Sequence, residues 1–244
     1  MKPDYDRAAR MAYKTLLALH IEELPIDPLQ ILSFCKNTIV RTYDELMFEC
    51  GQYDYYYFKK YFANSKDALL FRTVFESGNV SFELYYDNHG NQYRRRFTLA
   101  HELGHIILKH KGEEWWEERE ADFFASQLLV PWPIMEMNRE IGVAMHDPET
   151  VSRLFKVSRS AALVAIENTI HYMDEDLFEK IQRQFTNYAV EKLKNYINEK
   201  NNLENVRIIK QKVVRASDLF DNFGPSDPSK LRVSIVVPPA QQKM

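Results

Sequence analysis

The sequence predicts an α+β fold in which a small sheet is followed by a series of helices. Apolar and polar residues alternate with the period of a strand mainly before residue 87, most clearly in Val80–Tyr86. Helical spacing of apolar residues opens the chain at Tyr5–His20 and dominates from Arg96 onward. Apolar residues make up 45% of the 244 residues and charged residues 27%, a composition that allows a sizeable buried core.

Spacing and proline define the elements of the first third of the chain. The helix at Tyr5–His20 is closed off by two prolines that follow it, and Leu29–Cys35 predicts a second, shorter helix. Thr38–Phe75 is predicted to be rich in strands. The aromatic run Gln52–Phe58 inside it is interpreted as core or sheet-edge packing, because only two lysines lie close enough to support a base-stacking surface.

Residues 101–105 read His-Glu-Leu-Gly-His, an H-E-x-x-H motif in a run with helical spacing. Because side chains four residues apart share one face of a helix, the rings of His101 and His105 can converge on a single metal ion. Glu102 projects beside them, near the position that the metal leaves open. Two histidine ligands and an adjacent carboxylate base predict a zinc hydrolase, and the alternative is an amphipathic helix with two surface histidines.

The residues around the motif support a helix. Thr98 is predicted to cap its N-terminus. Gly104 costs a helix about 1 kcal/mol relative to Ala, which predicts that another backbone comes close to it. The apolar stripe of this helix lies away from the two histidines and contains Leu99, Leu103, Ile106 and Ile107.

A catalytic zinc ion usually has three protein ligands and keeps one position for water. Lys111 stands where the metzincin pattern requires a histidine, so this pattern fails, and His110 is interpreted as a helix-end cation. The thermolysin-like solution takes a glutamate from the next helix. Glu120 is the predicted third ligand because it borders the apolar stripe of that helix, and Glu117 is the next candidate.

The helix that carries Glu120 is predicted to end at Pro131 and Pro133. Its core stripe contains Ala121, Phe124, Ala125, Leu128 and Leu129. The acidic residues at its start are interpreted as a solvated first turn, and they are Glu113, Glu114, Glu117 and Glu118.

The segment Arg96–Leu108, followed by Glu120–Pro131, resembles the ImmA/IrrE family of metallo-endopeptidases. It shares the family's R-F-T-x-A-H-E-x-G-H stretch and then its E-A-[DN]-x-F-A-x-x-L-L-x-P stretch, and the resemblance runs from about Leu69 to Ile166. The resemblance implies a zincin-like peptidase domain that binds Zn²⁺, with Glu102 as the catalytic carboxylate. The implied metal ligands are His101, His105 and Glu120. The implied substrates are helix-turn-helix transcriptional repressors, often of phage or mobile-element type, which are cut or inactivated to release their genes.

Three features of the peptidase segment have two interpretations. Phe124 stands where an E-x-x-x-D pattern starting at Glu120 would place an aspartate, so Asp122 either orients a ligating histidine or faces solvent. Val80–Tyr86 is either a sheet edge on which an extended substrate adds by main-chain pairing or a strand that only packs the core. The basic run Arg94–Arg96 is interpreted as a solvated charged turn rather than a contact for an acidic substrate.

The pattern turns wholly helical after Pro133. Asp147–Thr150 opens a helix with proline near its first position, and Lys156–Val164 predicts a turn and a second helix. This pair resembles a helix-turn-helix unit, but nearby glutamates offset its basic residues, so a structural or partner-docking role is favoured over direct DNA binding. Asp174–Lys200 predicts a long helix that packs on the domain or on a partner. The remaining tail is loop-like, with one strand or disorder at 233–239.

The sequence therefore predicts three parts: a zincin-like metallopeptidase domain at 1–132, a helix-turn-helix-like segment at 133–173, and a helical extension with a loop-rich tail at 174–244. A net charge of −3 provides no basic field for nucleic acid. No signal peptide or bilayer-spanning run is visible, and two cysteines fit reduced thiols, so we expect a cytoplasmic protein without a membrane partner. The predicted function is zinc-dependent cleavage or inactivation of a repressor. The alternative is a non-catalytic regulator of the same fold that binds a repressor or DNA without proteolysis.

Overall fold

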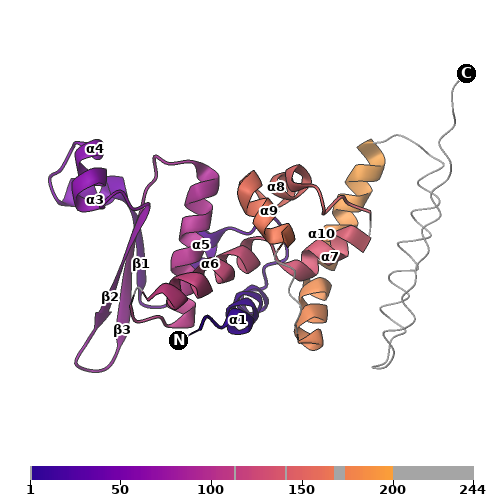
Figure 1. Ribbon diagram of the computed structural model, residues 1–244, viewed down its shortest axis with the longest axis horizontal. Coiled ribbons are helices and arrows are strands. Elements are labelled where there is room, and N and C mark those ends of the chain that lie inside the picture. The colour runs from indigo at the N-terminus through magenta and orange to yellow at the C-terminus, as the bar shows by residue number, and fades with distance from the viewer. Residues whose placement is uncertain (1, 113, 141, 168–173, 200–244) are drawn as a thin grey trace, which may run out of the picture. The chain divides into compact units, whose positions relative to one another are not determined.

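The computed structural model describes residues 2–112, 114–140, 142–167 and 174–199 (Figure 1). The chain divides into two compact units, residues 1–193 and 194–244, and the first contains the sheet and the helices of the motif. The predictions for the tail from Ser217 to Met244, including the strand at 233–239, lie outside the described residues.

Two helices open the chain, as the apolar spacing predicts. Helix α1 spans Tyr5–Ala18, and the side chain of Asp4 caps its N-terminus by accepting the backbone N–H of Arg7. Helix α2 spans Pro28–Ser33 and starts with proline in its first turn, a position where the missing N–H costs nothing.

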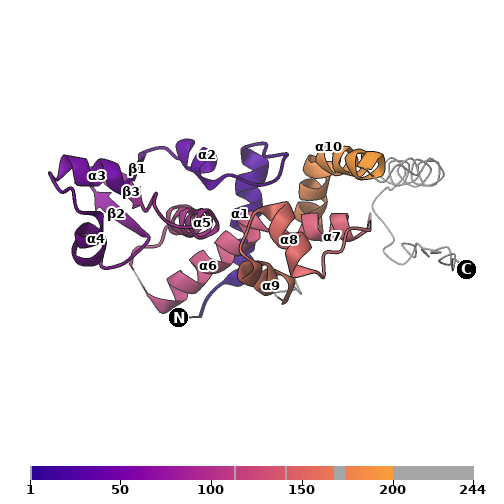
Figure 2. The same ribbon diagram turned by 90° about the horizontal axis from the view of Figure 1, so that it is seen from above.

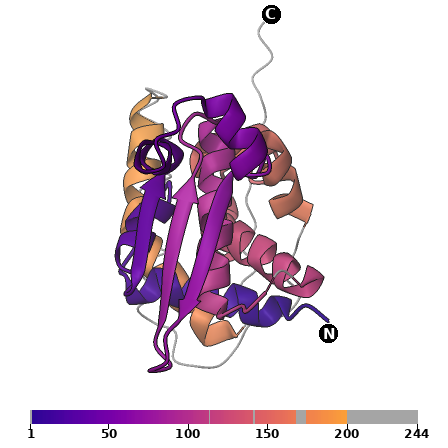
Figure 3. The same ribbon diagram turned by 90° about the vertical axis from the view of Figure 1, so that its left-hand side faces the viewer.

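A three-stranded sheet comes next, in the order β1-β3-β2 (Figure 3). Its strands are β1 at Thr38–Thr42, β2 at Ala68–Val74 and β3 at Val80–Tyr86. Strand β3 pairs in parallel with β1 and antiparallel with β2, so Leu84 lies between partners on both sides and is fully buried. The edge-strand interpretation of Val80–Tyr86 is therefore wrong, because both edges of β3 are occupied.

The stretch between β1 and β2 is helical, which corrects the strand-rich prediction for it. It contains α3 at Tyr43–Glu49, α4 at Tyr55–Tyr57 and a π-helical turn, η1, at Phe58–Phe62. A capping box between Thr42 and Glu45 ends β1 and starts α3 within one residue. Within the aromatic run only part of the core prediction is confirmed, because Phe58 is buried whereas Tyr53 and Tyr56 are more than 80% exposed.

Two long helices carry the motif residues. Helix α5 spans Gln92–Leu108 and α6 spans Trp115–Leu129, and Figure 2 shows α5 between the sheet and the pair α1 and α6. The cap predicted at Thr98 is wrong, because Asn91 caps α5 seven residues earlier. All five residues of the predicted core stripe of α6 are buried, as expected.

Gly104 marks the place where α5 and α6 touch. A Cβ atom there would lie 3.2 Å from the Cα of Ala121 and 3.1 Å from Cδ1 of Phe124. The predicted approach of another backbone is therefore confirmed. The neighbour is the main chain of Ala121, which cannot move aside as a flexible side chain could.

Replacing Gly104 by Ala is expected to lower the free energy of unfolding. Overpacking at such a contact costs about 1–3 kcal/mol, whereas the better helix propensity of Ala returns only about 1 kcal/mol. Thermal and urea unfolding followed by circular dichroism measures the difference. Gly90→Ala is the matched control, because a Cβ at Gly90 meets nothing closer than 3.8 Å. A Gly104→Ala variant as stable as the unmodified protein would contradict the contact.

The arginine run before the motif is structural. Arg96 donates from Nη2 to the carbonyl of Ile26 at 2.7 Å and to that of Phe155 at 3.3 Å, and from Nε to the carbonyl of Lys156 at 3.1 Å. The interpretation as a solvated turn is therefore wrong for Arg96, which joins α5 to two distant segments. Arg94 pairs with the Asp67 carboxylate.

Helices complete the described chain. They are α7 at Trp132–Glu140, α8 at Pro148–Phe155, α9 at Arg159–Glu167 and α10 at Glu175–Glu199. Helix α8 begins with proline as predicted, Asp147 caps it, and Lys156 takes a left-handed conformation, φ 53°, in the turn before α9. Buried Leu177, Ile181 and Phe185 join α10 to the same core as α1, α5 and α6. The boundaries at 132 and 173 stay predictions, although this one core draws on all three predicted parts.

Candidate metal centre

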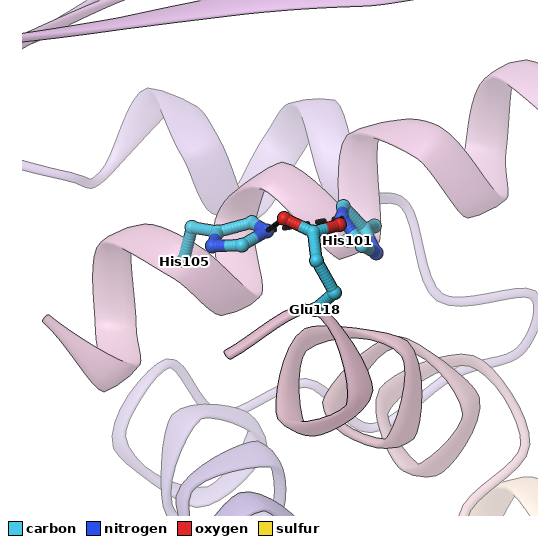
Figure 4. A group of neighbouring side chains, drawn as sticks. All are labelled: His101, His105 and Glu118. Carbon is cyan, nitrogen blue, oxygen red and sulfur yellow. Dashed lines mark hydrogen bonds and ion pairs between the residues drawn. The ribbon is translucent and has the colours of Figure 1, made fainter. Parts of the chain in front are cut away.

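The two histidines of the H-E-x-x-H motif converge (Figure 4). They come from successive turns of α5, and their Nε2 atoms lie 3.0 Å apart. Both rings are largely enclosed, with side chains of His101 and His105 only 16% and 11% exposed. The predicted convergence of the two rings is thus confirmed, because the i, i+4 spacing places them on one face of the helix.

Glu118 reaches the same place from the first turn of α6. Its Oε2 lies 3.4 Å from Nε2 of His101 and its Oε1 lies 3.5 Å from Nε2 of His105. The three side chains offer ligand atoms that all lie within 4.8 Å of one another. The interpretation of Glu118 as part of a solvated turn is therefore wrong, since it is the carboxylate that the fold brings to the histidines.

The outer nitrogens of both rings have their own partners. Nδ1 of His101 lies 2.9 Å from Oδ1 of Asp122, and Nδ1 of His105 lies 3.0 Å from Nδ1 of His110. Asp122 follows Glu118 by one helical turn, so both carboxylates project from the same face of α6. Asp122 therefore takes the ring-orienting position of its two interpretations, although its side chain stays partly exposed to solvent.

These contacts test whether a divalent cation fits. With each Nδ1–H donated outward, both Nε2 atoms carry lone pairs that face each other and an ionised carboxylate. Such an arrangement is repulsive unless a metal cation lies between the three groups or a proton occupies Nε2 of His101. Separations of 3.0–3.5 Å are also close to the roughly 3.4 Å between two ligands of a tetrahedral ion with bonds of about 2.1 Å. The residues present fit a zinc ion.

Protonation of the three groups is strongly perturbed. Burial favours the neutral form of His101, but hydrogen bonds to Asp122 and Glu118 and the charge of Glu102 outweigh it and raise its pKa to about 9. Burial and the nearby charge of His101 lower the pKa of His105. The hydrogen bond to His101 holds the pKa of Glu118 below its usual value. Perturbed groups gathered at one place are typical of a functional site.

Glu102 lies beside this cluster, half-buried on α5. Its negative charge contributes to raising the pKa of both His101 and the buried Tyr43. It therefore occupies the neighbourhood that its predicted role as a base requires.

Glu120, the predicted third ligand, lies elsewhere. Its carboxylate, 2% exposed, accepts the backbone N–H of Asp4 at 2.9 Å and contacts Arg7 Nη1 and His110 Nε2, each at 3.2 Å. The physical reason is helix geometry, since residues two apart point about 200° apart around the axis. When Glu118 faces the histidines, Glu120 faces α1.

Glu117, the second candidate, supports the loop between α5 and α6. Its buried carboxylate accepts the backbone N–H groups of Lys111, Gly112 and Glu114. These hydrogen bonds outweigh the effect of burial and lower its pKa. The oxygens of Glu117 therefore bind the backbone of this loop and do not reach the histidines.

The sequence contains a signal for the carboxylate that the fold places beside the two histidines, which the prediction did not name. Glu118 and Asp122 have E-x-x-x-D spacing, whereas the same pattern started from Glu120 fails at Phe124. Phe124 is fully buried in the core. His110 lies two residues beyond the end of α5, close to the helix end where the prediction put it, but its side chain is buried between His105 and Glu120.

One known family matches the part of the chain that contains this cluster. Residues 81–167 match the model of the Peptidase_M78 family, described as the IrrE N-terminal-like domain. This segment belongs to the ImmA/IrrE family. The ImmA/IrrE match runs from β3 through α9 and contains every residue of the candidate metal centre, whereas α1, α2 and the helical stretch after β1 lie before it.

No curated protein matches the chain at a significant level. Among the helices of the described residues, none has the length and apolar character needed to cross a bilayer.

Proposed function

We propose that this protein is a zinc-dependent endopeptidase whose metal is held by His101, His105 and Glu118. Glu118 thereby replaces Glu120 in the ligand set. The observation that carries the proposal is the convergence of two imidazole Nε2 atoms and one carboxylate from consecutive helices. Three such ligands with one open position are the usual equipment of a catalytic zinc site, and the match of residues 81–167 to a peptidase family supports the reaction class.

The chain's own residues supply the proton chemistry. Zinc, when bound, lowers the pKa of a water molecule from about 15.7 to about 7 and polarises the scissile carbonyl. Glu102 would accept a proton from the attacking water and pass it to the leaving amine, which is general base and then general acid catalysis by one carboxylate. Asp122 and His110 hold the two rings so that their Nε2 atoms face inward.

The proposed substrate is a helix-turn-helix transcriptional repressor of phage or mobile-element type, met in the cytoplasm. The resemblance of the motif region to ImmA/IrrE proteins supports this choice. A non-catalytic regulator that binds its repressor without cutting it is the second candidate. The pair α8 and α9 favours a docking role over DNA contact, because Leu163 and Val164 are exposed on α9 and Arg159 is its one basic residue.

Metal removal separates the two candidates. We expect the zinc-loaded protein to cut a candidate helix-turn-helix repressor into discrete fragments, which gel electrophoresis and mass spectrometry identify. The chelator 1,10-phenanthroline should abolish cleavage, and added Zn²⁺ should restore it. Stable binding of intact repressor by the zinc-loaded protein, without fragments, would support the regulator instead.

A further inference from the structure

His105 is the one predicted ligand whose outer nitrogen meets another imidazole. Its Nδ1 lies 3.0 Å from Nδ1 of His110, and Nε2 of His110 lies 3.2 Å from Oε2 of Glu120. The side chains of His110 and Glu120 are each only 2% exposed, and the ring of Trp116 packs edge-on against His110. The residues that lead from His105 to Glu120 are thus shielded from solvent.

Only one direction of hydrogen bonding through these groups suits a metal centre. If Nε2 of His105 keeps its lone pair for the cation, its proton resides on Nδ1 and is donated to His110. His110 then carries its own proton on Nε2 and donates it to Glu120. The opposite direction would place a proton on Nε2 of His105, pointing at His101 and Glu118. The carboxylate at the far end therefore selects the tautomer that the ion needs.

Helix α1 holds that carboxylate. Glu120 accepts the backbone N–H of Asp4 at 2.9 Å and pairs with Arg7, whose guanidinium also donates to the carbonyl of Leu108 at the end of α5. These contacts give the buried carboxylate the partners that a charged group needs away from water. A continuous set of contacts thus leads from His105 on α5, through His110 and Glu120, to Asp4 and Arg7 near the N-terminus.

The arm that supports His101 is different. Its Nδ1 contacts Asp122, which is 46% exposed and belongs to the same helix as Glu118. The contacts that place His101 reach Asp122, Glu118 and His105, which all belong to α5 and α6. The two histidines are therefore oriented differently. His101 is held by a partly exposed carboxylate of α6, whereas His105 is held by buried groups that in turn contact α1.

We propose that His110, Glu120 and Arg7 form a positioning relay that fixes the ring and tautomer of His105 and makes metal affinity depend on the contacts of Asp4 and Arg7 with Glu120. This inference rests on the proposed function only in taking His105 as a metal ligand. Groups that orient a ligating histidine typically contribute 10- to 100-fold to metal affinity.

The test measures Zn²⁺ affinity by competition with a chromophoric chelator and records the visible spectrum of the Co²⁺-substituted protein. We expect His110→Phe to lower zinc affinity by about 10- to 100-fold and to shift the cobalt bands. His110→Gln should restore most of the affinity, because an amide can accept from His105 and donate to Glu120. Arg7→Met, at a partly exposed site, should fold and lower affinity less than His110→Phe.

Tyr13→Phe is the matched control. It removes a buried hydrogen bond between Tyr13 of α1 and Gln127 of α6 without touching the relay, so zinc affinity should stay unchanged. Unaltered affinity and cobalt spectra in His110→Phe and Arg7→Met would overturn the relay, as would an equal loss in Tyr13→Phe. If His110→Phe does not fold, Arg7→Met and His110→Gln decide alone. An unmodified protein that binds no Zn²⁺ would instead overturn the metal centre itself.

Discussion

Glu102→Gln is expected to retain bound zinc and lose cleavage of the repressor. Glutamine keeps the shape of the side chain but cannot accept a proton, and a general base typically contributes about 10²- to 10⁴-fold to the rate. Neither His101 nor His105 changes, so the metal should remain. Single-turnover cleavage assays and elemental analysis of the same purified sample measure the two properties side by side.

His101→Ala provides the contrast, because it should lose both zinc and activity. Circular dichroism confirms that each variant is folded before its activity is compared. Cleavage at an undiminished rate by Glu102→Gln would show that another group takes the proton. Loss of zinc in Glu102→Gln would show instead that Glu102 serves the metal rather than the water.

The second large effect distinguishes two glutamates on one helix. Glu118→Ala is expected to lower zinc affinity by more than the 10- to 100-fold typical of a residue that only orients a ligand, because it removes one of three direct donors. Glu120→Gln should fall within that smaller range, since its carboxylate contacts His110, Arg7 and Asp4 but not the cluster. The order of the two losses decides the ligand.

Competition with a chromophoric chelator measures both variants, as it does for the relay. Glu117→Gln is a useful third member of the series, because its carboxylate binds three backbone N–H groups of the preceding loop. It should lower stability more than it lowers metal affinity. A larger loss of affinity in Glu120→Gln than in Glu118→Ala would restore Glu120 as the ligand and would contradict the role proposed for Glu118.

Local geometry explains which site features the sequence could predict. The convergence of His101 and His105 depends only on the pitch of one helix, and the close contact at Gly104 follows from the cost of glycine in that helix. Both inferences needed no knowledge of the rest of the chain. The class of fold was equally accessible, because the periods of strands and helices are properties of short segments.

The carboxylate that meets the two histidines is determined by how α6 docks. Glu120 borders the apolar stripe, as predicted, but that side of α6 is covered by α1 and not by the motif face of α5. Helical periodicity shows that a face is buried without showing which neighbour buries it. The E-x-x-x-D spacing of Glu118 and Asp122 was the local signal that could have shown which face of α6 meets the two histidines.

Strand order was similarly out of reach. Val80–Tyr86 has the alternation of a half-buried strand, but only its pairing with both β1 and β2 makes it central. The helical stretch after Thr42 was obscured by aromatic residues, which are common in strands. Capping by Thr42 and Asp54 overrides that preference.

An ion bound by two helices acts as a reversible cross-link. Ligands from α5 and α6 mean that zinc would fasten the pair already in contact at Gly104, so part of the binding free energy would appear as resistance to unfolding. In a cell short of zinc, loss of the ion would both silence the chemistry and leave the chain easier for the quality-control machinery to degrade. The supply of zinc would then determine both the steady-state amount of the protein and its activity.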